Sequence, residues 1–467
     1  MNKTKLAGLI LGLIGFCLPF IFTFSGLSSA GHFAMSIFLL AAVFWMFEVI
    51  PIYSTSLLVI FLQVGFLSSE GFIFDSSAIT ADGYSPVSYI QFLATLADPI
   101  IILFLGGFVL ADASVKYDFD KYLTKVLLRP FGSKPALLML GLMLVTATLS
   151  GFMSNTATTA MMITVIIPII AGMQKGDPAR IAIALSVPFA ANIGGIATPI
   201  GTPPNAVVIA ALNQQGKNIL FTDWIIYALP VTIIMLIFTW ILLLKLFPPA
   251  TTEVKVSLET KLKKNLHAYL VYSVFAITVI LWVTESLHGI KSAIVALIPV
   301  VVLTLSNSFE KQDIRKLPWE VLWLIAGGIA LGIGMKETGL AEWMVGSVGW
   351  DQLGAILLLL TFAVVALFMS NFLSNTVTAA LLIPLAISMA TSGVFEGMFG
   401  LMMVGLVIAV SCSFAMVLPI STPPNAIAQS TGLIETRHMA LAGLIVGIVG
   451  IVLVIIMTQV YWPFILN

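Results

Sequence analysis

Apolar stretches of about 20 residues, separated by short polar segments, run along the whole sequence. A helix of about 20 apolar residues is long enough to span the hydrocarbon core of a membrane. The chain is therefore expected to be an all-α polytopic membrane protein with about eleven transmembrane helices. The predicted spans are 6–26, 33–50, 53–68, 97–115, 178–214, 221–246, 267–285, 288–306, 319–335, 397–432 and 437–464.

Two further apolar regions, 135–173 and 352–394, are interrupted by polar residues near their middle. The interruption reads SGFMSNT from residue 150 and SNFLSNT from residue 370. Each region is long enough for two short helices that meet at a polar tip, which predicts a pair of re-entrant hairpins. Non-helical backbone at membrane depth is tolerated only where protein or a water-filled cavity satisfies it, so both tips are expected to face a cavity.

A second pair of polar motifs breaks two of the predicted spans. It reads TPIGTPPNA from residue 198 and LPISTPPNA from residue 418. Proline fits the first turn of a helix and disrupts its interior. We therefore expect each span to end, to unwind through Gly201 or Ser421, and to restart after Thr202 or Thr422, which are suitable N-cap residues.

Both motif pairs repeat at the same offset, because Ser150 and Ser370 lie 220 positions apart, as do Thr202 and Thr422. After the first span, each half holds five spans and one hairpin, and an odd number of spans inverts the second half. Inverted repeats with broken helices at the midplane are a recurring design of secondary transporters.

The chemistry of the motifs fits two kinds of ion. Ser154 and Ser374 are placed to cap the returning helices of the hairpins, so four helix N-termini would converge on one cavity. Backbone N–H groups at helix N-termini suit an anion. Exposed carbonyls, together with Ser, Thr and Asn oxygens, suit a hard cation such as sodium.

Composition and charge exclude several classes of protein. The chain is 60% hydrophobic and 9% charged, whereas soluble proteins average about 25% charged, so a soluble enzyme is excluded. Zero net charge, two cysteines and four scattered histidines indicate no nucleic-acid partner, disulfide framework or metal cluster. The hairpin regions contain no Asp, Glu, Lys or Arg, which argues against a proton pump. No Ser–His dyad, paired Asp residues or metal cluster marks an intramembrane enzyme, and no cofactor is expected.

Charge placement predicts the orientation. With a cytoplasmic N-terminus, 18 Lys and Arg residues fall in inner segments and 3 in outer ones, namely Lys217, Lys291 and Lys336. This distribution follows the positive-inside rule, and the acidic loop 69–92 suits an outer position. The expected location is the plasma or inner membrane. The alternative that the first apolar stretch is a signal peptide, suggested by LSSAG, is not needed to explain the charges.

At the SNT and PPN motifs the sequence resembles the divalent anion/sodium symporter family, whose members carry dicarboxylates, citrate or sulfate. The resemblance covers nearly the whole chain, and the paired motifs are specific in combination. It implies a homodimer in which each protomer has a scaffold and a transport domain that moves like an elevator. The implied scaffold comprises 1–133 and, with a linker, 248–350. The implied transport domain comprises 134–247 and 351–467, each with one hairpin and one broken helix.

The resemblance also implies roles for individual residues. The first sodium site would use Ser150, Ser154, Asn155 and the backbone around Gly201. The second sodium site would use Ser370, Ser374, Asn375 and the backbone around Ser421. The substrate-binding residues would be Asn155, Thr156, Thr202, Pro203, Ser374, Asn375, Thr376, Thr422 and Pro423.

The leading hypothesis is a sodium-coupled secondary transporter of C4-type dicarboxylates, of the succinate, fumarate, malate and 2-oxoglutarate class. A sodium-independent dicarboxylate exchanger and a sulfate carrier are the alternatives. A channel is disfavoured because two opposed gates around an inverted repeat favour alternating access. Lys116 and Lys336, 220 positions apart, form a basic pair that could serve an exchanger or anchor the chain at the membrane interface.

Overall fold

The computed structural model describes residues 3–22, 24–72, 84–254, 262–347, 354–391 and 397–466. In these ranges all regular structure is helical, apart from one isolated β-bridge between Ser68 and Val87. Ten helices or helix runs within them are long and apolar enough to cross a membrane. The prediction of an all-helical, multi-pass protein is therefore confirmed. Much of the acidic loop 69–92, as well as Lys255 and Lys261, lies outside the described residues.

Every predicted span of the first half has a helical counterpart. The elements are α1 (Lys3–Ile21), α2 (Ser29–Phe47), α3 (Ile52–Leu67), α5 (Tyr89–Leu93), η1 (Ala94–Ala97), α6 (Pro99–Lys116), α7 (Phe119–Leu128), η2 (Arg129–Phe131), α8 (Pro135–Phe152), α9 (Asn155–Ala171), α10 (Ala179–Gly194), η3 (Gly195–Ala197), α11 (Pro203–Gln214) and α12 (Phe221–Leu246).

Every predicted span of the second half also has a helical counterpart. Its elements are α13 (Leu266–Val283), α14 (Glu285–His288), α15 (Ser292–Val295), α16 (Leu297–Leu305), α17 (Lys311–Lys316), α18 (Trp319–Glu337), α19 (Leu340–Gly346), α20 (Ala355–Phe372), α21 (Asn375–Thr391), α22 (Gly397–Ser413), α23 (Pro423–Ser430), α24 (Thr436–Val460) and α25 (Trp462–Ile465).

Both predicted hairpins are present. Only Met153 and Ser154 separate α8 from α9. The Ser154 hydroxyl accepts a hydrogen bond from the Ala157 N–H at 3.1 Å, and in the second hairpin Ser374 accepts from the Val377 N–H at 3.2 Å. Each SNT serine therefore caps the returning helix, as the sequence predicts.

Both predicted helix breaks are present as well, one between α10 and α11 and one between α22 and α23. Thr422 caps α23, because its hydroxyl accepts from the Asn425 N–H at 3.3 Å. Thr202 occupies the N-cap position of α11 without a side-chain cap, so that expectation is wrong in detail. The Asn205 N–H instead bonds the backbone oxygen of Thr202, at 3.1 Å.

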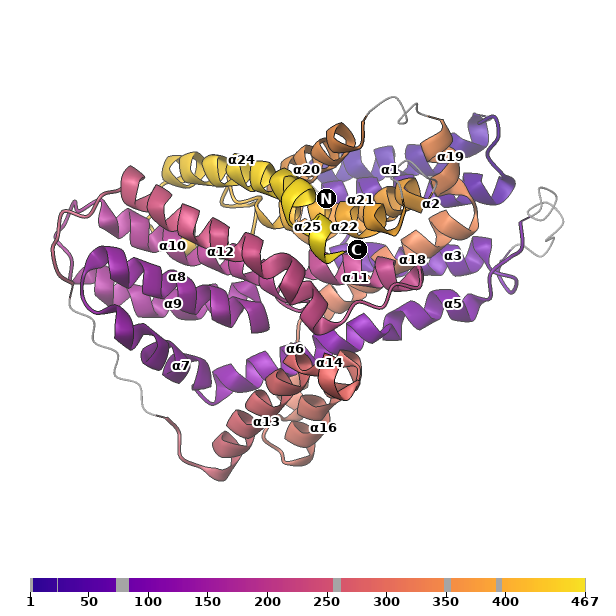
Figure 1. Cartoon of the computed structure of the whole chain (residues 1–467). Coiled ribbons are helices and arrows are strands. Elements are labelled where there is room, and N and C mark those ends of the chain that lie inside the picture. The colour runs from indigo at the N-terminus through magenta and orange to yellow at the C-terminus, as the bar shows by residue number, and fades with distance from the viewer. Residues whose placement is uncertain are drawn as a thin grey trace.

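The two halves interlock through these motifs. Helix α9 of the first hairpin packs against α23, which follows the break of the second half. Helix α21 of the second hairpin packs against α11, which follows the break of the first half. Figure 1 shows α8, α9, α10 and α12 gathered at one end, with α1, α2, α3 and α18 at the other. Neither set of motifs is therefore enclosed by its own half alone.

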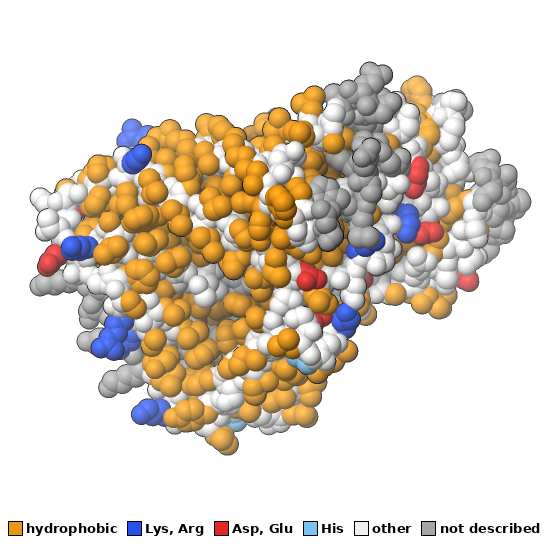
Figure 2. Space-filling view, viewed as in Figure 1, with side chains coloured by type: hydrophobic (Ala, Val, Ile, Leu, Met, Phe, Trp, Pro, Cys, Tyr) orange, Lys and Arg blue, Asp and Glu red, His pale blue; other side chains and the backbone are white. Residues whose placement is uncertain are grey.

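The outer surface is suited to lipid. Hydrophobic side chains cover most of the face in Figure 2, and basic side chains lie mainly toward its margins. Helices α12 and α24 contribute, with Ile233, Ile237, Ile448 and Val452 all substantially exposed. Exposed apolar bands of this kind identify a multi-pass membrane protein. The particular membrane and the cytoplasmic N-terminus stay predictions.

Candidate functional site

The first-half site is a cluster of oxygen atoms between the tip of the first hairpin and the helix break. Ser150 is fully buried, and its hydroxyl donates to the carbonyl oxygen of Ala191 at 2.8 Å. The same hydroxyl lies 2.5 Å from Oδ1 of Asn155. The structure thus brings together two residues predicted for the first sodium site and adds a backbone carbonyl from α10.

The Asn155 amide completes this cluster. Its end nearest Ser150 also lies 3.1 Å from the carbonyl oxygen of Gly201 and 3.2 Å from that of Ala191. With Nδ2 in that position, the amide donates to both carbonyls. With Oδ1 there, it faces two oxygens that have no proton to give, which is favourable only if a cation lies among them. The side chains of Ser150 and Asn155 and the backbone of Gly201 therefore converge, whereas the hydroxyl of Ser154 caps α9. That these residues bind sodium stays a prediction.

Two glycines allow this close approach. A Cβ atom on Gly195 would lie 2.6 Å from Oδ1 of Asn155 and 3.0 Å from the carbonyl oxygen of Gly201. A Cβ atom on Gly201 would collide with the backbone of Gly195. Larger residues at either position would push the unwound backbone away from the hairpin tip.

The asparagine of each TPPN motif stabilises the break between the two helices on either side of it. The fully buried Asn205 side chain donates through Nδ2 to the carbonyl oxygens of Thr198 at 2.8 Å, Gly195 at 3.1 Å and Ile196 at 3.3 Å. Carbonyl groups at the end of a helix lack intrahelical partners. Asn205 satisfies those groups where α10 and η3 end, so the break is a stable feature of the fold.

The second-half break repeats this device with different additions. Asn425 Nδ2 donates to the carbonyl oxygens of Met416 at 3.0 Å and Leu418 at 3.1 Å. The Ser421 hydroxyl donates to the backbone or side-chain oxygen of Asn371, both at 3.1 Å. Asn371 is not among the predicted site residues, although it lies within the second hairpin motif.

The second-half cluster contains buried oxygens without partners. Within the described ranges of the chain, the Ser411 hydroxyl and Oδ1 of Asn375 have no hydrogen-bond partner, and the Ser370 hydroxyl has only a weak contact with the thiol of Cys412. Ser370 and Ser411 are fully buried. Ser370, Ser411 and Asn375 lie 220 positions after Ser150, Ala191 and Asn155, respectively. Unpaired buried oxygens are costly, and here they occupy the positions equivalent to the first-half oxygen cluster.

The predicted substrate residues differ in accessibility between the halves. Thr156 and Ser374 are exposed, whereas Thr376, Thr202 and Thr422 are buried. Pro423 is exposed and Ser154, Asn155, Asn375 and Pro203 are intermediate. Ser374 also lines a cavity of about 290 Å³ with Lys5 and Glu48. One hairpin tip thus opens into a space bordered by α1 and α2.

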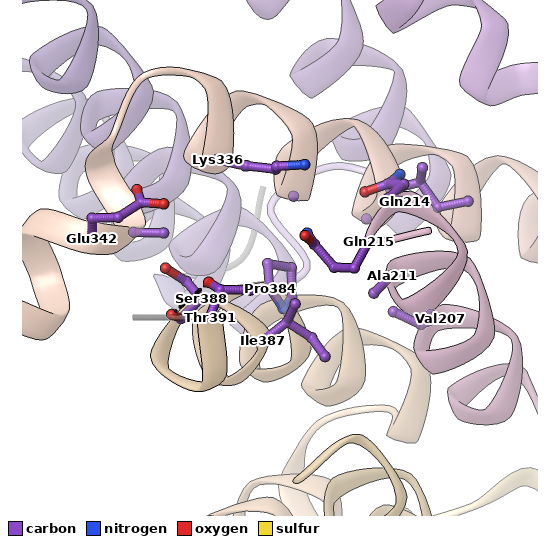
Figure 3. Close-up of a pocket in the computed structure, with 14 residues that line it drawn as sticks. Val207, Ala211, Gln214, Gln215, Lys336, Glu342, Pro384, Ile387, Ser388 and Thr391 are labelled. Atoms are coloured by element: carbon purple, nitrogen blue, oxygen red, sulfur yellow. Dashed lines mark hydrogen bonds between the residues drawn. The ribbon is translucent and has the colours of Figure 1, made fainter. Parts of the chain in front are cut away.

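A separate cavity of about 130 Å³ lies between α11, α18, α19 and α21. Lys336, Gln214, Glu342 and Ser388 line it (Figure 3), and none of the predicted site residues does. The other member of the basic pair, Lys116, lies 2.7 Å from a carboxylate oxygen of Asp313. The two lysines therefore differ in environment despite their equivalent positions.

Sequence reasoning missed four residues at these sites: Ala191, Asn192, Asn371 and Ser411. Asn371 and Ser411 carry a detectable signal, because they fall at the positions of Gly151 and Ala191 in the other half. A polar residue replacing a small one at an equivalent position marks a difference between two otherwise matching sites. The carbonyl of Ala191 carries no such signal, because its role comes only from the backbone.

Comparison with known proteins identifies the family of this chain. The model of the citrate transporter family matches residues 42–410. The sodium-dependent dicarboxylate transporters SdcS of Staphylococcus saprophyticus and Staphylococcus aureus are each 29% identical, over 99% of this chain and 92% of theirs.

Solved structures agree on the fold. The crystal structure of the YdaH transporter of Alcanivorax borkumensis superposes with a TM-score of 0.58 at 12% identity, covering 92% of this chain and 98% of that one. The family match confirms the resemblance to divalent anion transporters recognised in the sequence. The chain therefore belongs to the citrate transporter family, a family of membrane transporters rather than enzymes.

Proposed function

We propose that this protein is a sodium-coupled secondary transporter of C4-type dicarboxylates. The observation that carries the proposal is the oxygen cluster formed by Ser150, Asn155, Ala191 and Gly201 at the meeting point of a hairpin tip and a helix break. The names of the two staphylococcal relatives support both the sodium and the dicarboxylate.

Sodium fits the first-half cluster for a physical reason. With Nδ2 toward Gly201 and Ala191 the Asn155 amide satisfies both carbonyls by itself, whereas with Oδ1 toward them it creates an all-oxygen environment. A sodium ion among these oxygens would remove their mutual repulsion, as unwound backbone carbonyls do in other transporters. In the second half, Asn375 and Ser411 supply unpaired oxygens for an equivalent site, and Ser370 supplies a hydroxyl whose contact with a thiol is weak.

The hairpin helices would hold the substrate without a formal positive charge of their own. The hairpin helices carry no Asp, Glu, Lys or Arg. The N-termini of α9 and α21 at the SNT tips, and of α11 and α23 at the TPPN breaks, would supply N–H groups for two carboxylates. A dianion there is neutralised by two sodium ions, which explains why coupling would be required.

Transport would proceed by movement of one region of the protein against another. The proposed moving region is 134–247 with 351–467, and the interlocking of α9 with α23 and of α21 with α11 supports its moving as one body. Helices α1, α2, α3 and α18 pack with one another and would belong to the static scaffold. The proposed assembly is a homodimer in the plasma or inner membrane.

The exchanger alternative has less support in this structure. A basic pair could offset substrate charge in an exchanger, but Lys116 is engaged by Asp313 and Glu310. Lys336 lines a cavity away from the hairpin tips. Neither lysine lines the cavity that contains Ser374.

Uptake of labelled succinate into proteoliposomes tests the proposal. An inward sodium gradient should drive uptake into vesicles that contain no internal substrate. Uptake only when the vesicles are preloaded with dicarboxylate, and without any need for sodium, would establish the exchanger instead. Sulfate as the preferred competitor of the label would favour the inorganic-anion carrier.

A further inference from the structure

One side chain links the two halves at the centre of the site. Asn192 lies on α10, is 1% exposed, and has no role in the function proposed above. Its Nδ2 donates to Oγ1 of Thr422 at 3.0 Å and to Oδ1 of Asn425 at 3.4 Å. Asn192 therefore connects the first broken helix directly to the TPPN motif of the second half.

Among the described residues, the link from Asn192 has no counterpart at the equivalent position of the other half. The position equivalent to Asn192 is Cys412, which is fully buried. Among the described residues, Cys412 makes no hydrogen bond to Thr202 or Asn205. Oδ1 of Asn205 has no partner there, whereas Oδ1 of Asn425 accepts from Asn192. The two TPPN threonines, Thr202 and Thr422, therefore differ in their hydrogen-bond partners.

The hydrogen bonds at Thr422 determine where its own proton can point. A threonine hydroxyl has two acceptor lone pairs and one proton to donate. Asn192 Nδ2 occupies one lone pair, and the Asn425 N–H occupies the other at 3.3 Å. With both acceptor positions filled, the hydroxyl is left to act as a donor, and a carboxylate oxygen is the acceptor best suited to it.

Asn192 also borders the first-half cluster. The carbonyl of Ala191, the preceding residue, accepts from Ser150 and lies 3.2 Å from the amide end of Asn155. A cation that reorganises this carbonyl would act on the peptide unit shared with Asn192. A single residue, Asn192, therefore connects the proposed sodium site to Thr422.

We propose that Asn192 is a positioning residue that fixes the Thr422 hydroxyl as a donor to one substrate carboxylate and ties that donor to the first sodium site. This inference rests on the proposed function, because it assigns Thr422 to an anionic substrate. The Thr202 hydroxyl accepts no such bond from any residue that the structure describes, so it is not fixed in this way. The two ends of the substrate site are consequently unequal.

Succinate binding to the purified full-length protein, measured by calorimetry at several sodium concentrations, tests the proposal. Asn192→Ala should weaken succinate binding about tenfold at saturating sodium, because a charge-assisted hydrogen bond loses its fixed donor. Thr422→Val should weaken it similarly, and the double variant should be no weaker than Thr422→Val alone. The dependence of succinate affinity on sodium should be flatter in Asn192→Ala than in the native chain.

Two further variants separate positioning from folding. Asn192→Cys introduces the residue that the equivalent position already carries, and it should reproduce the loss in affinity even if Asn192→Ala folds poorly. Ser186→Ala, which removes a fully buried hydroxyl of α10 that bonds to the carbonyl oxygen of Ile183 in the same helix, should leave succinate affinity within about twofold. A folded Asn192→Cys variant with native affinity and native sodium dependence would overturn the inference, as would additive effects in the double variant. If the native chain binds no dicarboxylate in sodium, the proposed function itself fails and this inference with it.

Discussion

The side-chain amide of Asn205 lies 2.8 Å from the carbonyl oxygen of Thr198, seven residues earlier in the chain. The second half repeats the contact between Asn425 and Leu418, at 3.1 Å. An asparagine at the start of one helix arm thus caps the end of the arm before it. The break is held by the same TPPN motif that creates it.

Asn205→Ala should destabilise the protein by about 1–3 kcal/mol, because it leaves buried carbonyl oxygens without a donor. Asn205→Asp keeps the size of the side chain but replaces the donor by another oxygen that faces the carbonyls, so it should be worse than Asn205→Ala. Thermal unfolding in detergent measures both. Equal stabilities for the two variants would show that size, rather than hydrogen bonding, matters at this position.

Asn155→Ala and Asn375→Ala should abolish sodium-driven succinate uptake while the protein stays folded. Each variant removes an amide at a hairpin tip, where it borders several oxygens in the first half and contributes an unpaired Oδ1 in the second. Uptake in proteoliposomes and the elution profile in size-exclusion chromatography give the two readouts. Native uptake by either well-folded variant would remove that residue from the proposed site.

Acidification should reduce succinate transport before it affects the fold. Carboxylic acids have ordinary pKa values near 4, so the dianion is lost as the pH falls toward that value. Because helix N-termini and two sodium ions favour the dianion, uptake should fall progressively between about pH 6 and 4. An increase that follows the monoanion would contradict the dipole argument.

Asp177 should limit stability at still lower pH. Burial alone would raise the pKa of Asp177, but hydrogen bonds from Thr251 and from the N–H groups of Ala250 and Ala179 outweigh it and lower the pKa. A carboxylate with a lowered pKa stabilises the fold above its unfolded pKa of about 3.9, and this contribution disappears as the pH falls through the folded value.

Asp177→Asn should therefore cost about 1–3 kcal/mol at pH 7, because an amide cannot accept all of these hydrogen bonds. The stability difference between native and variant protein should shrink below pH 4. Thermal unfolding of both proteins over a pH series measures this stability difference. A difference that stays constant down to pH 3 would show that the carboxylate charge contributes nothing.

Asp120 should have the opposite effect on stability. It lies on the buried face of α7 with Thr124, is 1% exposed, and no side chain among the described residues donates a hydrogen bond to its carboxylate. Burial raises the pKa of Asp120, so the ionised form destabilises the fold once the pH rises above the unfolded pKa. Asp120→Asn is expected to raise the melting temperature at pH 7, with the gain disappearing below about pH 4.

Asp118 provides a matched control at the start of the same helix. Its carboxylate lies 2.7 Å from Lys121 Nζ and 2.6 Å from Lys263 Nζ near the surface. Asp118→Asn should lower stability by no more than about 1 kcal/mol. Stabilisation by both variants would indicate a general effect of removing negative charge rather than the burial of Asp120.

The positions of the hairpin tips and helix breaks could be predicted because the cause is local. A capping serine in each SNT motif and a proline pair after a threonine determine helix boundaries within a few residues. The 220-residue offset then identifies equivalent positions. It does not reveal which half each side chain contacts, and the bonds from Asn192 to Thr422 and from Ser421 to Asn371 depend on tertiary packing. The failure of Thr202 to cap α11 has a local origin instead, since its backbone oxygen accepts the hydrogen bond from the Asn205 N–H that the side chain was expected to accept.

The interlocking of the halves has a consequence for how the protein is made. Asn192 leaves the ribosome 230 residues before Thr422, and at about 5–20 residues per second this interval is roughly 10–50 s. During that time α9 and α11 have entered the bilayer without α23 and α21, the helices that cover them. The polar SNT and TPPN segments of the first half must meanwhile be hydrated or shielded by the insertion machinery. Until α21 and α23 have been translated, the nascent first half therefore depends on water or on that machinery to cover its polar segments.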